Sequence, residues 1–232
     1  MPSLLDSCRI VRLPASIRQL ASEANMQFPL SLRQFIADQH CPFSQCVRVH
    51  FKSLQAPTVP VSTMLLSMRA VYATADIGVI VGSQEALSGP NFTLLVDLDV
   101  GPCQRGTTSA EQNQLFQNRN NAGANDIVVY FTRSVLQNNT TTLNGCASFP
   151  AGRPGVAVAQ VASRWTMAHE VGHALGLNHF PRGTCQPADC PPQAPAPTRL
   201  MTCCGTALIA GTATVTQGEI DTMRDSDITF QC

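Results

Sequence analysis

The chain has 232 residues with no net charge, and charged side chains make up only 13% of it while hydrophobic ones make up 44%. This balance suits one compact domain with extensions and excludes a disordered chain. Lys52 is the only lysine, so no basic stripe exists to follow a phosphate backbone, and no apolar run approaches the roughly 18 residues that cross a bilayer. We therefore expect neither a nucleic-acid partner nor a membrane span.

Residues 1–40 precede the part of the chain with strong strand patterns. Apolar positions within residues 15–39 have the spacing of two short helices broken near Pro29. This pattern fits either an N-terminal extension packed on the core or the remnant of a pro-segment, and both interpretations stay open. The N-terminus has no signal-peptide apolar core, so we expect any export signal to lie outside this chain.

A half-buried strand is predicted at residues 47–51, where apolar and polar side chains alternate. His50 falls on the polar side of this strand, and we expect it at the surface, like His40. Residues 61–75 have the spacing of an amphipathic helix, and residues 77–81 have the composition of a buried strand.

Residues 94–100 predict a further strand, along which Asp97 and Asp99 alternate with apolar side chains. Two carboxylates could bind Ca²⁺, but without a recognisable binding loop a solvated strand face is the better interpretation. The polar stretch at residues 111–125 is typical of an exposed connection with at most a helical turn.

The second half of the chain contains the clearest strand and the longest predicted helix. Residues 126–132 form an apolar run typical of a buried strand, and short strands are expected at residues 146–149 and 155–160. A long helix is predicted to start near Ser163. Residues 216–219 (Thr-Gln-Gly-Glu) have the pattern of a capping box, which opens a final helix.

Ten cysteines stand outside any C-x-x-C pattern: Cys8, Cys41, Cys46, Cys103, Cys146, Cys185, Cys190, Cys203, Cys204 and Cys232. An even number of this size indicates up to five disulfides in an oxidising compartment, so we expect a secreted or extracellular protein. The spacings Cys41–Cys46 and Cys185–Cys190 would close small loops, although spacing alone does not decide the pairing. The adjacent Cys203 and Cys204 are expected to pair with different partners.

The most specific motif is residues 169–179, which read His-Glu-Val-Gly-His-Ala-Leu-Gly-Leu-Asn-His and match H-E-x-x-H-x-x-G-x-x-H at every position. His169 and His173 are about one helical turn apart, so their imidazoles lie on the same face and can share one metal ion. Gly176 is placed where a helix can end at positive φ, after which His179 can turn back as a third ligand. Three protein ligands leave the fourth zinc position open, as in catalytic sites.

Glu170 is the carboxylate of this motif, and it lies beside the metal position without being needed as a ligand. A structural zinc site has no use for such a group, whereas a catalytic site uses it as a general base. Ordinary surface histidines on an amphipathic helix are the alternative interpretation, and the extension to Gly176 and His179 counts against it. A thiolate of Cys203 or Cys204 as a zinc ligand is a further alternative, although three histidines already suffice.

The motif resembles the long zinc motif of the metzincin zinc metalloproteases. In that clan a tight turn further along the chain carries a methionine beneath the metal, and residues 200–205 (Leu-Met-Thr-Cys-Cys-Gly) match it with Met201 in that place. The subfamily is unassigned, because the third histidine is followed by Ser or Thr in matrixins, Asp in adamalysins, Glu in astacins and Pro in serralysins, but by Phe180 here. Residues 145–147 (Gly-Cys-Ala) are faintly similar to pappalysin-like enzymes.

The resemblance implies an α/β metzincin-like fold, with a metalloprotease catalytic domain at residues 41–232. The upper subdomain (residues 41–178) would contain a twisted mixed sheet and the long zinc-binding helix. The lower subdomain (residues 179–232) would be rich in loops and would carry the final helix.

The resemblance also implies a ligand set and a substrate. One catalytic Zn²⁺ would be held by His169, His173 and His179, with Met201 beneath it. A protein or peptide substrate would lie extended along an edge strand of the sheet.

The predicted function is that of a secreted zinc endopeptidase, in which Glu170 activates water at the metal for attack on a peptide bond. Two alternatives stay open: a non-catalytic extracellular zinc-binding module, and a disulfide-rich surface protein whose histidines are incidental. The first would bind zinc without turnover, and the second would hold no zinc. Substrate sequence and oligomeric state do not follow from these patterns.

Overall fold

A computed structural model describes residues 43–181, 188, 190–192 and 194–232. The helices expected within residues 15–39, the interpretation of residues 1–40 and the surface position of His40 lie outside the described residues.

The centre of the fold is a six-stranded mixed sheet. Its strand order is β2-β1-β4-β8-β7, and β9 pairs with β1 beside this path. β1, β2, β4 and β8 run parallel to one another, whereas β9 is antiparallel to β1 and β7 is antiparallel to β8. The strands are β1 (Gln45–Ser53), β2 (Ile77–Ala86), β4 (Ile127–Thr132), β7 (Gly145–Cys146), β8 (Gly155–Ala159) and β9 (Phe230–Gln231). A mixed sheet was expected from the family resemblance, and it is confirmed.

A second, three-stranded sheet and the helices surround the main sheet. The second sheet has the order β3-β5-β6, formed by β3 (Asp97–Asp99), β5 (Ser134–Gln137) and β6 (Thr141–Leu143). The α-helices are α3 (Val61–Tyr72), α4 (Pro90–Thr93), α5 (Ala110–Leu115), α6 (Thr166–Ala174) and α7 (Gln217–Arg224). Two short 3-10 helices complete the elements, η3 (Ala73–Ala75) and η5 (Thr206–Leu208).

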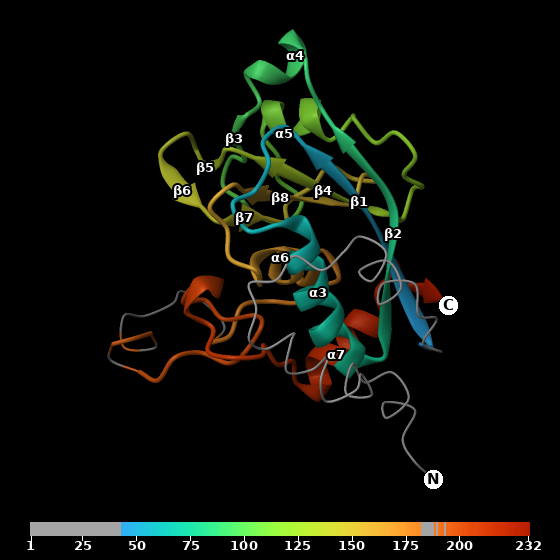
Figure 1. The fold of residues 1–232 in the computed structure, drawn as a ribbon, viewed down its shortest axis with the longest axis vertical. Helices are drawn as coiled ribbons and strands as arrows, with labels where there is room; N and C mark the ends of the chain where they lie inside the picture. Colours follow the sequence, from blue (N-terminus) through green and yellow to red (C-terminus); the bar gives the residue numbers. More distant parts are fainter. Residues whose placement is uncertain (1–42, 182–187, 189, 193) are drawn as a thin grey trace, which may run out of the picture.

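Two hydrophobic clusters hold these layers together, one on each face of the main sheet. The first lies between the sheet and helices α3 and α6, and the second lies beneath α5 and β3 (Figure 1). β4 contributes alternate residues to both clusters, such as Val129 to the first and Val128 to the second. Because both of its faces are covered, β4 is a continuous apolar run rather than an alternating one. The strand predicted at residues 126–132 is thereby confirmed.

Several other predicted elements are confirmed with changed bounds. The helix expected at residues 61–75 consists of α3 and η3, and Tyr72 in it donates a hydrogen bond from its hydroxyl to the carbonyl of Ala168 in α6 (2.9 Å). The strand expected at residues 94–100 is only three residues long, because Pro90 starts a short helix before it. Helix α7 begins with the predicted capping box, in which Thr216 and Glu219 bond each other's backbone N–H.

Asp97 and Asp99 are partly exposed on β3, as expected for a solvated strand face. The carboxylate of Asp97 accepts hydrogen bonds from the side chains of Arg133 and Ser134. The carboxylate of Asp99 accepts from the backbone N–H groups of Gly101 (3.1 Å) and Asn139 (3.0 Å). Both carboxylates are therefore engaged within the protein.

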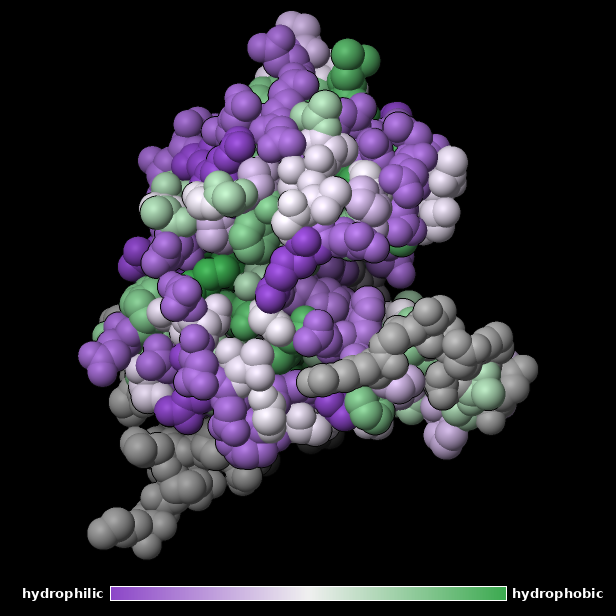
Figure 2. Space-filling view, turned by 180° about the vertical axis from the view of Figure 1, so that it is seen from behind, coloured by the Kyte–Doolittle hydropathy of each residue, from purple (hydrophilic) through white to green (hydrophobic). Residues whose placement is uncertain are grey.

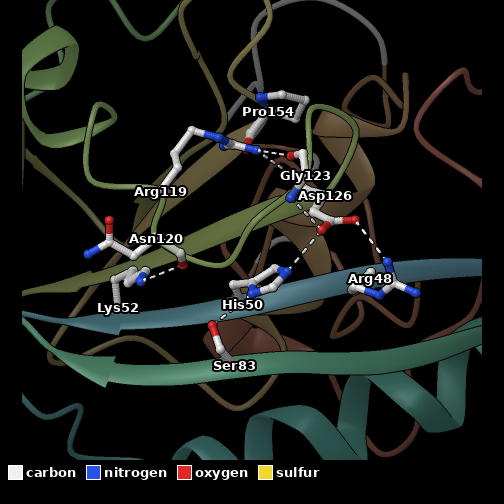
Figure 3. A network of polar contacts seen from close by, with 9 residues as sticks. All are labelled: Arg48, His50, Lys52, Ser83, Arg119, Asn120, Gly123, Asp126 and Pro154. Carbon is white, nitrogen blue, oxygen red and sulfur yellow. Dashed lines mark hydrogen bonds and ion pairs between the residues drawn. The ribbon is translucent and has the colours of Figure 1, made fainter.

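The surface position predicted for His50 is wrong, because its side chain is only 2% exposed. Its ring hydrogen-bonds Ser83 Oγ through Nδ1 (2.7 Å) and Asp126 Oδ2 through Nε2 (3.0 Å) (Figure 3). A Cβ on Gly82 would lie 2.2 Å from this ring, so the glycine leaves room for it.

The only lysine shares this buried polar layer. Lys52 is fully buried and pairs with Glu85. It also donates to the carbonyl of Asn120 (3.0 Å) in the connection that precedes β4 (Figure 3). At His50 and Lys52 the polar side of β1 thus faces a covering loop rather than water, whereas the side chain of Arg48 on the same side is 42% exposed. Alternation of apolar and polar residues indicates two different faces, and here the second face is also buried over part of its length.

Three disulfides join described residues: Cys46–Cys232, Cys103–Cys146 and Cys190–Cys204. The small loops suggested by the spacings Cys41–Cys46 and Cys185–Cys190 are not formed. Cys46 bonds Cys232 and Cys190 bonds Cys204, across longer separations. Cys203 is also disulfide-bonded, so it and Cys204 have different partners, as expected. Three sulfurs, of Cys190, Cys203 and Cys204, lie within 4.8 Å of one another, but none is a free thiolate that could bind zinc.

The surface is mainly hydrophilic on the face seen from behind, where hydrophobic residues form small separate patches (Figure 2). Within the described ranges, no helix combines the length and the apolar character that crossing a bilayer requires.

Candidate metal centre

Helix α6 positions two of the three motif histidines and the motif glutamate. His169 and Glu170 are buried, with exposed fractions of 5% and 6%. The helix ends where predicted, because Gly176 adopts a φ of +108°, a conformation that side chains disfavour. This turn brings His179 back toward the helix.

The three histidines converge through the same ring atom. Their Nε2 atoms are 3.1 Å apart for His169 and His179, 3.1 Å for His169 and His173, and 3.0 Å for His173 and His179. Because zinc–nitrogen bonds measure about 2.0–2.1 Å, nitrogens that share one zinc ion must lie within about 4 Å of one another. The donor set therefore fits a single zinc ion.

Two of the rings are oriented by backbone carbonyls. Nδ1 of His169 donates to the carbonyl of Leu200 (2.7 Å), and Nδ1 of His173 donates to that of Leu177 (2.8 Å). With the proton on Nδ1, each Nε2 presents its lone pair to the shared point, the arrangement that metal-ligating histidines use.

Burial keeps these imidazoles neutral. It lowers the pKa of His169 to about 3, where the neighbouring His173 adds to the effect, and it lowers the pKa of His173 to about 4. Burial also lowers the pKa of His179. Neutral rings at pH 7 are a requirement for metal binding, because a protonated nitrogen has no lone pair to donate.

Glu170 lies against strand β7. A Cβ added to Gly145 would lie 2.6 Å from Cγ and 2.7 Å from Oε1 of Glu170, so a glycine is needed for the carboxyl group to occupy this place. Burial raises the pKa of Glu170 to about 8. Strand β7 is held by its pairing with β8 and by the Cys103–Cys146 disulfide.

Met201 lies in a buried turn under α6. Its Sδ atom would be 3.0 Å from a Cβ on Gly172, so turn and helix are in close contact. The backbone N–H of Phe180 donates to the Met201 carbonyl (2.7 Å), which joins the segment after His179 to this turn. The residues singled out in the sequence are thus brought together.

Other groups that contribute to the site could not be recognised clearly from the sequence. The carbonyls of Leu200 and Leu177 are backbone groups, which any residue type provides. Arg105 donates from Nη2 to the carbonyl of His173 (2.8 Å) at the end of α6, where a cation complements the helix dipole. For Gly145 the sequence offers only the faint similarity of residues 145–147 to pappalysin-like enzymes, and the general tendency of glycine inside a strand to mark a close approach.

One solved structure has a similar fold, and a second aligns more weakly. Metalloproteinase-II from Bacteroides fragilis aligns with a TM-score of 0.51 and 12% identity, over 80% of this chain and 54% of that one. The present chain therefore spans about half the length of that protein, and the likeness concerns the fold alone. Archaemetzincin from Methanopyrus kandleri aligns with a TM-score of 0.41 and 14% identity, over 78% of this chain and 87% of that one.

Sequence comparison identifies the family. No curated protein matches the chain. Residues 47–223 match the profile of the family described as metallo-peptidase family M12B, reprolysin-like. This range includes the entire zinc motif and Met201. The chain therefore belongs to the reprolysin-like M12B metallopeptidases, within the metzincin clan of zinc metalloproteases.

Proposed function

We propose that the chain is a secreted zinc endopeptidase in which His169, His173 and His179 hold one catalytic Zn²⁺ and Glu170 is the general base. The observation that supports this most directly is the convergence of three neutral Nε2 atoms within 3.1 Å of one another. Membership of a metallopeptidase family supports peptide hydrolysis as the reaction. The disulfides favour an extracellular location.

Glu170 carries out the proton transfers in this proposal. The three histidines would hold the zinc ion, whose positive charge would favour the ionised form of Glu170 and polarise the scissile carbonyl and the attacking water. The Glu170 carboxylate accepts the proton of that water and then delivers it to the nitrogen of the leaving amine. Its burial keeps bulk water away from this transfer.

The remaining parts of the proposed site bind the substrate peptide or support helix α6. An extended substrate peptide is proposed to lie along β7, which is an antiparallel edge strand and pairs only with β8 among the described residues. Met201 supports α6 from below. We further propose that the zinc site lies between an upper subdomain at residues 41–178 and a lower subdomain at residues 179–232.

The Glu170→Ala variant tests the catalytic role. Zinc is expected to stay bound, because Glu170 is not needed as a ligand, while peptide hydrolysis disappears. Zinc content measured by atomic absorption and cleavage of a fluorogenic peptide give the two readouts. Unchanged cleavage in this variant would contradict the mechanism.

A further inference from the structure

We propose that Arg199, stacked on Phe180 and paired with Glu219, is a positioning residue that fixes the third metal-site histidine, His179. This inference rests on the proposed function, because it assigns a role within the zinc site. It also accounts for Phe180, the residue that separates this chain from the named metzincin subfamilies.

Within the described ranges, His179 has no counterpart to the backbone carbonyls that orient the other two histidines. Nδ1 of His169 and Nδ1 of His173 each donate to a backbone carbonyl, at 2.7 and 2.8 Å. Among the described residues, Nδ1 of His179 has no such partner. A metal-ligating histidine is normally held through its second ring nitrogen, so the position of the residue that follows His179 gains importance for the orientation of its ring.

The next residue, Phe180, is held in place by the turn that contains Met201. Its N–H donates to the Met201 carbonyl (2.7 Å), and its own carbonyl accepts from the N–H of Cys203 (3.2 Å). Its side chain is 49% exposed, yet the guanidinium carbon of Arg199 lies 4.1 Å from the centre of its ring. This distance is well within the range of a cation–π contact.

Arg199 is itself fixed from two directions. Its Nη2 donates to Glu219 Oε1 (2.6 Å), and the side chains of Arg199 and Glu219 are 25% and 12% exposed. The backbone beside it is also held, because the Leu200 N–H donates to the Thr214 carbonyl (2.8 Å). The guanidinium is therefore held over the Phe180 ring rather than free to swing into solvent.

Glu219 extends this arrangement to helix α7. One carboxylate oxygen, Oε2, accepts from the N–H of Thr216 (2.7 Å) in the capping box, while Oε1 accepts from Arg199. The helix is anchored in the core by Met223, which is fully buried. A rigid element thus holds Glu219, Glu219 holds Arg199, and Arg199 holds the ring that follows His179.

Loss of this stacking should weaken zinc binding without removing a ligand. The affected group is one residue away from His179, so the effect should lie at the lower end of the roughly 10–100-fold range seen when partners of metal ligands are removed. We expect about a tenfold weaker zinc affinity in Arg199→Gln and in Phe180→Leu.

The test is zinc affinity of the full chain, measured by competition with a chromophoric chelator. Phe180→Tyr keeps an aromatic ring under the guanidinium and is expected to stay within about twofold of the unmodified chain. Arg164→Gln is the matched control, since Arg164 also stacks on an aromatic ring, that of Trp165 at 4.9 Å, and donates to the carbonyl of Gly211. Its zinc affinity is expected to be unchanged.

The outcomes separate this inference from the proposed function. If the unmodified chain binds no zinc, both fail. If it binds zinc and Arg199→Gln and Phe180→Leu bind it equally well, the positioning role alone is overturned. A loss of affinity in Phe180→Tyr as large as that in Phe180→Leu would also overturn it, because stacking would then not be the cause. Should Arg199→Gln fail to fold by circular dichroism, the comparison of the two Phe180 variants decides.

Discussion

Gly145→Ala is expected to remove most of the peptidase activity while leaving zinc in place. The new methyl group would lie 2.6 Å from Cγ, 2.7 Å from Oε1 and 2.8 Å from Cδ of Glu170. Since ordinary carbon contacts begin near about 3.5 Å, the carboxyl group must move by roughly 1 Å. Strand β7 cannot easily retreat, because the Cys103–Cys146 disulfide and its pairing with β8 hold it.

A displacement of this size has a calculable effect on the rate. Misplacement of a reacting group by about 1 Å can cost on the order of a hundredfold in rate, which corresponds to about 2.7 kcal/mol of transition-state free energy. The loss should appear in kcat, because the role proposed for Glu170 concerns the proton of the attacking water rather than the binding of the peptide. Zinc affinity should stay unchanged, because the three atoms nearest to the added Cβ all belong to Glu170, which is not needed as a ligand.

The assay is steady-state cleavage of a fluorogenic peptide, combined with zinc content. Gly218→Ala is the matched control, because no atom lies within 4 Å of the Cβ that it would add. A kcat of Gly145→Ala within about threefold of the control, less than 1 kcal/mol, would refute the argument that Gly145 makes room for the general base.

Three further predictions concern stability. Tyr72→Phe removes the buried hydrogen bond between α3 and α6 and should lower the unfolding free energy by about 1 kcal/mol in urea titrations; an unchanged midpoint would count against it. Replacing Cys46 and Cys232 together by serine removes a disulfide between positions 186 residues apart and should lower the unfolding free energy by about 3–5 kcal/mol. A variant as stable as the unmodified chain would contradict a stabilising role of this disulfide. The hydrogen bond from Arg133 lowers the pKa of Asp97 from 3.8 to about 2, so the ionised form is favoured in the folded state. The ionised Asp97 carboxylate therefore stabilises the folded state above pH 3.8, and this stabilisation is lost as the pH falls from 3.8 toward 2. Asp97→Asn should thus lower the melting temperature at pH 6 but hardly at pH 2; an equal decrease at both pH values would contradict this prediction.

The convergence of the three motif histidines could be predicted because these residues are close in the sequence. His169, His173, Gly176 and His179 lie within eleven residues, and the geometry of one helix followed by one glycine turn is enough to bring the rings together. The apolar run of β4 was equally informative, because a strand covered on both faces needs apolar residues throughout.

The features missed by sequence reasoning depend on contacts between distant parts of the chain. The alternation along β1 correctly indicated a strand, but the covering loop that buries His50 and Lys52 lies about 70 residues later, at Asn120 and Asp126. The need for Gly145 arises only where β7 passes α6. Disulfide pairing likewise depends on the folded path, which spacing does not encode.

The central claim is that the chain is a catalytic zinc endopeptidase, and digestion of a peptide library by the zinc-loaded full chain tests it most directly. Cleavage sites would be identified by mass spectrometry, with a chelator and the Glu170→Ala variant as controls. We expect cleavage at internal peptide bonds that requires zinc and is absent in the variant. Stoichiometric zinc binding without cleavage of any peptide would contradict the claim and would instead indicate a non-catalytic zinc-binding module.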